Sequence, residues 1–129
     1  MTEYKKTDDY EGKAATFQIV MLHQLNEALR DAGIADQAKR REICENFGFA
    51  FGVLSDQSWF KDADGTKVYP CIAFSTRGPA SEVDPEDLGT VFLPSSMFAF
   101  HEYLHGNAAE LFEEMQEDLS VVEMGNADS

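Results

Sequence analysis

Apolar residues in the first third of the chain recur every three to four positions, the spacing of one face of an α-helix. The helix is expected to run from about Lys13 to Ala32 and to end at Gly33, which accepts a positive φ. Its apolar face carries Phe17, Met21, Leu22, Leu25, Ala28, Leu29 and Ala32. The opposite face, expected to meet solvent, carries His23, Asn26, Glu27 and Arg30.

A second helix is expected to begin at Asp36, whose carboxylate can cap it, and to continue into the longest apolar run, Ile43–Phe60. Alternation within residues 47–54 would also fit a strand, but the spacing favours a helix. Gly48 and Gly52 each cost about 1 kcal/mol of helix propensity relative to Ala. They therefore predict a close approach by another backbone, which could belong to the first helix, the sheet or a second copy of the protein.

The same run is expected to supply much of the core, because it holds the densest group of large apolar side chains. These are Phe47, Phe49, Phe51, Val53, Leu54, Trp59 and Phe60. The short connection between the two helices predicts an antiparallel hairpin.

After residue 58 the apolar residues come in short runs broken by turn residues, which is typical of strands. Trp59–Lys61 and Lys67–Ser75 are expected to form a hairpin around Asp62-Ala63-Asp64-Gly65, because Asp-Gly favours a tight turn. Residues 76–89 have the composition of a loop, and Thr90–Leu93 is expected to be a third strand. These runs predict a sheet of about three antiparallel strands.

A C-terminal helix is expected to begin at Ser95 or Ser96, and Gly106-Asn107 is expected to interrupt it. Asn107 and Glu110 could cap a fresh helix that runs to about Val122, so this region holds one helix or two. At helical spacing the buried stripe is Phe100, Leu104, Ala108, Leu111, Phe112, Met115 and Leu119.

These elements predict a single α+β domain over residues 1–129, in which an N-terminal helical hairpin packs on a small antiparallel sheet followed by one or two C-terminal helices. Residues 1–12 and 124–129 are expected to be loose tails. The chain has 129 residues, 43% of them apolar, and no run approaches the roughly 20 apolar residues of a membrane span. With no recognisable signal peptide, Cys44 and Cys71 are expected to be reduced thiols of a cytoplasmic protein.

Charge is distributed unevenly along the chain, which has a net charge of −14. Residues 1–77 hold 12 acids and all 10 bases, whereas residues 78–129 hold 12 acids and no Lys or Arg. Such an acidic half repels nucleic acid and anionic membranes and attracts a basic protein. A solvated acidic face that only aids solubility is the plainer interpretation.

The leading functional hypothesis is therefore a small acidic interaction protein that binds a basic partner through its C-terminal region. The candidate partner-binding residues are Glu110, Glu113, Glu114, Glu117 and Asp118.

His101-Glu102-Tyr103-Leu104-His105 matches the His-Glu-x-x-His pattern of zinc metallohydrolases. Histidines four apart on a helix can bind one Zn²⁺, and the Glu can act as general base on a zinc-bound water. A zinc-dependent hydrolase with ligands His101 and His105 and base Glu102 is therefore the alternative function. No third ligand is evident, and histidines flanking a buried stripe are also ordinary structural residues.

A third hypothesis is a non-catalytic homo-oligomer, such as a homodimer, that assembles through the Gly48/Gly52 face or through exposed aromatic residues.

Overall fold

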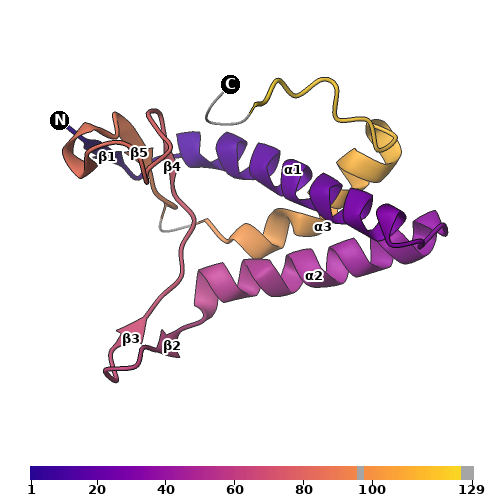
Figure 1. Cartoon of the computed structure of the whole chain (residues 1–129), viewed down its shortest axis with the longest axis horizontal. Coiled ribbons are helices and arrows are strands. Elements are labelled where there is room, and N and C mark those ends of the chain that lie inside the picture. Colours follow the sequence, from indigo (N-terminus) through magenta and orange to yellow (C-terminus); the bar gives the residue numbers. More distant parts are fainter. Residues whose placement is uncertain (96–97, 126–129) are drawn as a thin grey trace.

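The computed structural model describes residues 1–95 and 98–125 and has the expected α+β class. Two long helices, α1 (Asp9–Asp31) and α2 (Gln37–Gln57), are joined by a short turn in which Gly33 adopts a φ of 96°. They diverge from this turn, and the C-terminal helical segment lies between them, with the three-stranded sheet at the other end of α1 (Figure 1). Asp36 caps α2 as predicted, because its carboxylate accepts a hydrogen bond from the Ala38 N–H.

The sheet is mixed and not wholly antiparallel. Its order is β1 (Glu3–Lys5), β5 (Thr90–Phe92), β4 (Phe74–Ser75), with β1 parallel and β4 antiparallel to β5. A short 3₁₀ turn, η1 (Pro85–Asp87), lies in the loop that precedes β5. The predicted Asp-Gly hairpin forms a separate pair of strands, β2 (Phe60–Lys61) and β3 (Lys67–Val68), away from the sheet.

The expectation of a loose tail over residues 1–12 is wrong. Residues 3–5 pair with β5, and α1 begins at Asp9, four residues before the predicted start. Tyr10 is buried and its hydroxyl donates to the carbonyl of Ile72 at 2.6 Å, so long-range contacts fix this end of the chain. Of the second predicted tail, residues 126–129 lie outside the described residues.

The predicted strand Lys67–Ser75 is also wrong in extent, because only its two ends are strands, β3 and β4. Pro70 cannot donate to a ladder, which favours a break in this segment. The carbonyl of Ile72 bonds instead to the side chain of Tyr10 on α1.

The C-terminal helical segment is one continuous run with three pitches: the 3₁₀ helix η2 (Phe100–Tyr103), the α-helix α3 (Leu104–Ala109) and the π-helix η3 (Glu110–Glu114). Gly106-Asn107 does not interrupt it, since both residues lie within α3. Asn107 donates its side-chain amide to Gln18 on α1 and does not cap a new helix. The run ends well before Val122, because Gln116 and Glu117 have φ values of 51° and 63°. It also begins after Ser95; Ser96 lies outside the described residues.

The predicted buried stripe of this segment is confirmed for five of its seven residues, whereas Met115 and Leu119 lie beyond the helical run and are only partly buried. Phe100, Leu104, Ala108, Leu111 and Phe112 are buried. Together with Leu22 and Cys44, the last four form one core cluster, while Phe100 joins Tyr10, Ala14 and Phe92 in a second.

The predicted contribution of residues 47–60 to the core is largely wrong, since of the seven residues named only Phe51 packs against a core cluster and Val53 is partly buried. The large residues that were expected inside are largely exposed, namely Phe47, Phe49, Leu54, Trp59 and Phe60. The buried residues of α2 are instead Arg40, Cys44, Gly48 and Gly52, spaced four apart. A Cβ at Gly52 would lie 2.7 Å from Cα of His101, and one at Gly48 would lie 2.7 Å from Cδ2 of Leu104. The predicted close approach of a backbone is thus confirmed at Gly52, where η2 of the same chain makes it, whereas Gly48 is covered by the side chains of Leu104 and Leu22.

Candidate functional site

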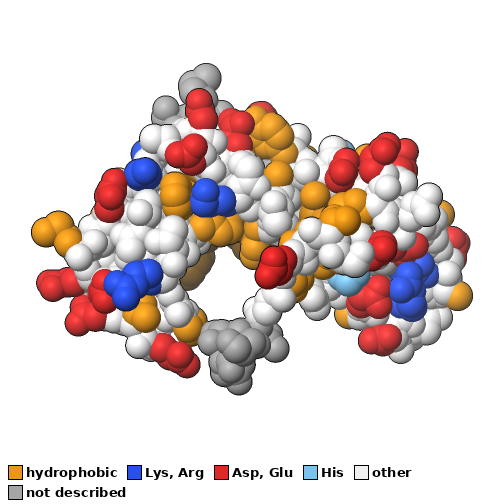
Figure 2. Space-filling view, turned by 90° about the horizontal axis from the view of Figure 1, so that it is seen from above, with side chains coloured by type: hydrophobic (Ala, Val, Ile, Leu, Met, Phe, Trp, Pro, Cys, Tyr) orange, Lys and Arg blue, Asp and Glu red, His pale blue; other side chains and the backbone are white. Residues whose placement is uncertain are grey.

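The acidic C-terminal segment presents carboxylates on a face set by its buried neighbours. Leu111 and Phe112 are buried in the core, which turns Glu110, Glu113 and Glu114 of η3 toward solvent. Figure 2 shows acidic side chains spread over the surface, with hydrophobic side chains reaching the surface between them. Four of the five predicted partner-binding residues are exposed, since Asp118 also faces solvent.

Glu117, the fifth, is held inside the chain. One oxygen, Oε1, accepts from Asn26 Nδ2 at 2.7 Å and from Arg30 at 2.8 Å, and lies 3.2 Å from Nη2 of Arg40. The other oxygen accepts from Gln37 Nε2 at 2.8 Å. With its side chain only 16% exposed, Glu117 joins the C-terminal segment to both long helices.

Arg40 is the buried cation of this network. Its Nε donates to Asn26 Oδ1 at 2.9 Å, and its Nη1 donates to the carbonyls of Ile34 and Ala35 at 2.9 and 2.7 Å. Asn26 was predicted to face solvent, and this is wrong, because its side chain is fully buried. Its position four residues after Leu22 places it on the buried face of α1, a signal that a search for apolar residues alone overlooks.

The network keeps Glu117 ionised. Burial acts to raise the pKa of Glu117, but hydrogen bonds from Asn26, Gln37 and Arg40 and the charge of Arg30 outweigh burial and lower the pKa overall. The carboxylate is therefore a structural anion with a complete set of partners, which leaves little capacity for an external ligand.

The exposed carboxylates differ in whether a cation already pairs with them. Glu113 lies 2.9 Å from Nη2 of Arg41. Within the described part of the chain, Glu110, Glu114 and Asp118 have no Lys, Arg or His within ion-pair distance. Hydrogen bonding from Ser120 lowers the pKa of Asp118, so this group also is charged at neutral pH. These three carboxylates are thus available to an external cation.

The two histidines of the His-Glu-x-x-His pattern both face carboxylates of α2. His101 Nδ1 and its backbone N–H each lie 2.7 Å from Asp56 Oδ2, and His105 Nδ1 lies 3.2 Å from Glu45 Oε1. The ring of Phe49 contacts both imidazoles, with centroids 5.5 Å from His101 and 5.8 Å from His105. In each histidine the Nε2 atom is left without a partner among the described residues.

The backbone around these histidines departs from the regular helix of zinc hydrolases. His101 lies in the 3₁₀ turn η2, whereas His105 lies in α3, and Glu102 is exposed. Among residues 1–95 and 98–125, no group of three or more His, Cys, Asp or Glu side chains is arranged to hold a metal ion. A hydrogen bond from Nδ1 to a carboxylate is nevertheless the usual support of a zinc-bound histidine.

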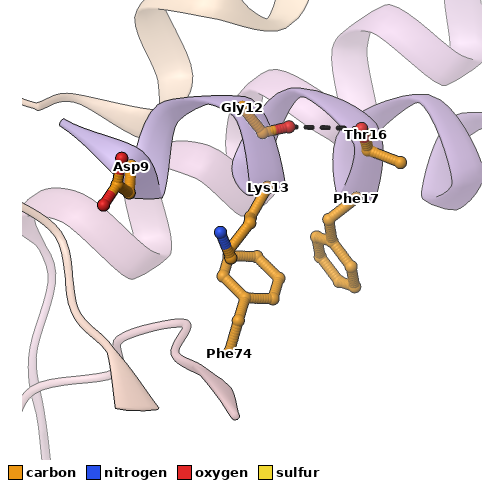
Figure 3. Close-up of a pocket in the computed structure, with 6 residues that line it drawn as sticks. All are labelled: Asp9, Gly12, Lys13, Thr16, Phe17 and Phe74. Carbon is orange, nitrogen blue, oxygen red and sulfur yellow. Dashed lines mark hydrogen bonds between the residues drawn. The ribbon is translucent and has the colours of Figure 1, made fainter. Parts of the chain in front are cut away.

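A shallow hollow of about 490 Å³ lies beside the first turns of α1 (Figure 3). Its walls are Asp9, Gly12, Lys13, Thr16, Phe17 and Phe74. The amine of Lys13 sits 3.9 Å from the ring centroid of Phe92, and Thr16 donates its hydroxyl to the Gly12 carbonyl. The sequence pattern predicts no site here, and these polar groups are largely engaged within the chain.

No protein family, curated protein or solved structure matches this chain. Among the described residues, no helix combines the length and apolar character that crossing a membrane requires.

Proposed function

We propose that this protein is an acidic interaction protein of the cytoplasm that binds a Lys- or Arg-rich segment of another protein. The binding surface is the outward face of the C-terminal segment, with Glu110, Glu114 and Asp118 as the principal contacts. The observation that supports the proposal is the exposure of these three carboxylates without a cation from the described part of the chain.

The surface is held in place before a partner arrives. Leu111 and Phe112 hold η3 in the core, and Glu117 ties the following turn to Arg30 and Arg40. A preformed surface loses less conformational entropy on binding than a loose acidic tail would lose. Glu117 therefore anchors the C-terminal segment to the two long helices and does not itself contact the partner.

Long-range charge supports the same partner class. Residues 78–129 contain no Lys or Arg, so this part of the chain attracts cations and repels phosphate backbones. Attraction of this kind raises association rates and weakens as salt screens it over about 10 Å at 0.1 M.

The test measures binding of a short fluorescent oligolysine peptide by anisotropy at low and moderate salt. One variant combines Glu110→Gln, Glu114→Gln and Asp118→Asn. The matched control combines Glu42→Gln, Glu82→Gln and Glu86→Gln, three exposed acids elsewhere. Each variant neutralises three acids, so both have a net charge of −14 + 3 = −11.

We expect the C-terminal variant to lose roughly tenfold or more in affinity, which corresponds to about 1.4 kcal/mol. The control is expected to lose much less, because its net charge is equal but its altered groups lie elsewhere. Equal losses in the two variants would show that only net charge matters and would refute the proposed surface.

Zinc binding is a second candidate function, favoured by the orientation of His101 and His105. Both Nδ1 atoms face carboxylates, which would leave both Nε2 atoms for a metal and Glu102 as a base beside it. Protein purified without a tag or chelator would then contain about one zinc per chain, and His101→Ala would remove it. Metal-free wild type that also fails to take up added zinc would exclude this function.

A further inference from the structure

A second stripe on α2 is apolar and exposed. It consists of Ile43, Phe47, Ala50 and Leu54. Phe47 and Leu54 are 50% and 49% exposed, Ala50 is exposed and Ile43 is partly buried. The intervals of four, three and four residues are those of a heptad seam, which packs against another helix.

This stripe is separate from the glycine face. Gly48 and Gly52 are covered by Leu104 and by the backbone of His101 in the same chain. A second copy therefore cannot assemble on the glycine face, as the sequence had allowed. The exposed stripe lies on the adjacent side of α2 and remains available.

Three of the four stripe residues, Phe47, Ala50 and Leu54, also lie in a stretch without charge, whereas Ile43 precedes it. Residues 46–55 contain none of the 24 acids and 10 bases of the chain. Two copies that each carry −14 repel each other, and the repulsion is smallest where an uncharged surface is presented. The residues that would flank the seam, Asn46, Phe51 and Val53, are uncharged as well.

We propose that the occupant of this stripe is a second copy of the chain, packed as an antiparallel α2–α2 pair about a two-fold axis. An axis between Phe47 and Ala50 places each Phe47 opposite the other copy's Ala50, so a large side chain meets a small one. The same axis places Ile43 opposite Leu54. Trp59 and Phe60, which follow α2 after Ser58, are exposed as well, and a stable interface needs roughly 800 Å² per partner.

Salt distinguishes this dimer from the proposed binding of a basic partner. The interface is apolar and the copies repel each other, so added salt is expected to strengthen dimerisation. Binding of a basic partner is expected to weaken under the same change. Failure of either proposal therefore leaves the other intact.

Sedimentation equilibrium of the whole chain, from low to high micromolar concentration and at two salt concentrations, tests the interface. Leu54→Glu adds an acid to the seam, and Ala50→Arg adds bulk at the axis while lowering the net negative charge to −13. Val121→Glu is the control, because Val121 is 81% exposed and lies outside α2. Circular dichroism checks that each variant is folded.

We expect the wild type and Val121→Glu to dimerise, and both seam variants to be folded monomers with at least a tenfold weaker association. Loss of the dimer in Ala50→Arg is decisive, because general electrostatics alone would strengthen it. A monomeric wild type at every concentration and salt, or dimers in both seam variants, would overturn the proposal.

Orientation is tested by a short bifunctional maleimide in a Cys71→Ser background. Ala50→Cys places two thiols beside the axis and is expected to crosslink. Gln57→Cys places them about 25 Å apart in an antiparallel pair, at a rise of about 1.5 Å per residue, and is expected not to crosslink. Crosslinking through position 57 with none through position 50 would overturn the antiparallel pairing.

Discussion

Two stripes run along α2, and the buried one holds both glycines and no large apolar side chain. Arg40, Cys44, Gly48 and Gly52 face the rest of the chain, whereas the adjacent stripe with Phe47 and Leu54 faces solvent. The difference follows from how closely other elements approach the helix. The His101 backbone lies where a Cβ at Gly52 would be, so no large side chain fits there. Proximity of backbones, and not hydrophobicity alone, decides which face of this helix is buried.

Two acids of the C-terminal segment differ in a similar way, one being largely buried and the other exposed. Glu117 is a carboxylate whose partners lie in the chain, while Glu114, three residues earlier, has none among the described residues. The first therefore contributes to stability, and the second belongs to the surface that we propose binds a basic partner.

The largest effect is expected from Glu117→Ala, which disrupts the buried stripe at Arg40. The guanidinium of Arg40 would remain buried without its carboxylate, and we expect a loss of about 3 kcal/mol in the free energy of unfolding, measured with urea. Glu114→Ala is the control and is expected to change stability by less than about 0.5 kcal/mol. Similar losses in the two variants would mean that Glu117 does not hold the segment to α1 and α2.

Gly52→Ala tests the close approach on the buried stripe. The added Cβ would lie 2.7 Å from Cα of His101, and we expect a net loss of about 1–2 kcal/mol, because overpacking exceeds the gain in helix propensity. Gly12→Ala in α1 is the matched control, since no atom lies within 4 Å of its added Cβ. That control is expected to gain up to about 1 kcal/mol. Stabilisation by both substitutions would contradict the packing of η2 on α2.

Acid is expected to weaken the anchor gradually. The folded-state pKa of Glu117 is lower than the value of about 4.3 expected for an unfolded chain. The contribution of ionised Glu117 to the free energy of unfolding is therefore complete above that pH and is lost as the pH falls through the folded pKa. The stability difference between wild type and Glu117→Gln should be constant near neutral pH and shrink below about pH 4. A difference that grows on acidification would contradict the pairing.

The smallest effect is expected from Leu54→Ala on the exposed stripe. In dilute solution, where the proposed dimer would dissociate, the free energy of unfolding should change by less than about 0.5 kcal/mol. A loss above about 2 kcal/mol would show that Leu54 is packed inside a single chain.

Periodicity predicted the α+β class, both long helices and the buried stripe of the C-terminal segment as far as Phe112. It failed at α2, because a hydrophobic pattern cannot show that Gly48 and Gly52 lie under η2 and α3 and so displace Phe47 to the surface. It failed at Asn26 and Arg40 for a related reason, since polar residues are buried here only because they bond to each other and to Glu117. The bond between Asn26 and Glu117 joins residues 91 positions apart, which no local pattern reveals.

Thiol accessibility gives the most direct test of the two stripes. In a Cys71→Ser background, Cys44 marks the buried stripe, and burial raises the pKa of its thiol to about 11. Phe47→Cys places a second thiol three residues away on the exposed stripe. We predict that Cys44 stays unmodified in the folded protein, while the introduced thiol reacts rapidly. Rapid modification of Cys44, with the introduced thiol protected, would show that the Cys44 stripe is exposed and the Phe47 stripe is buried, the reverse of the packing described above.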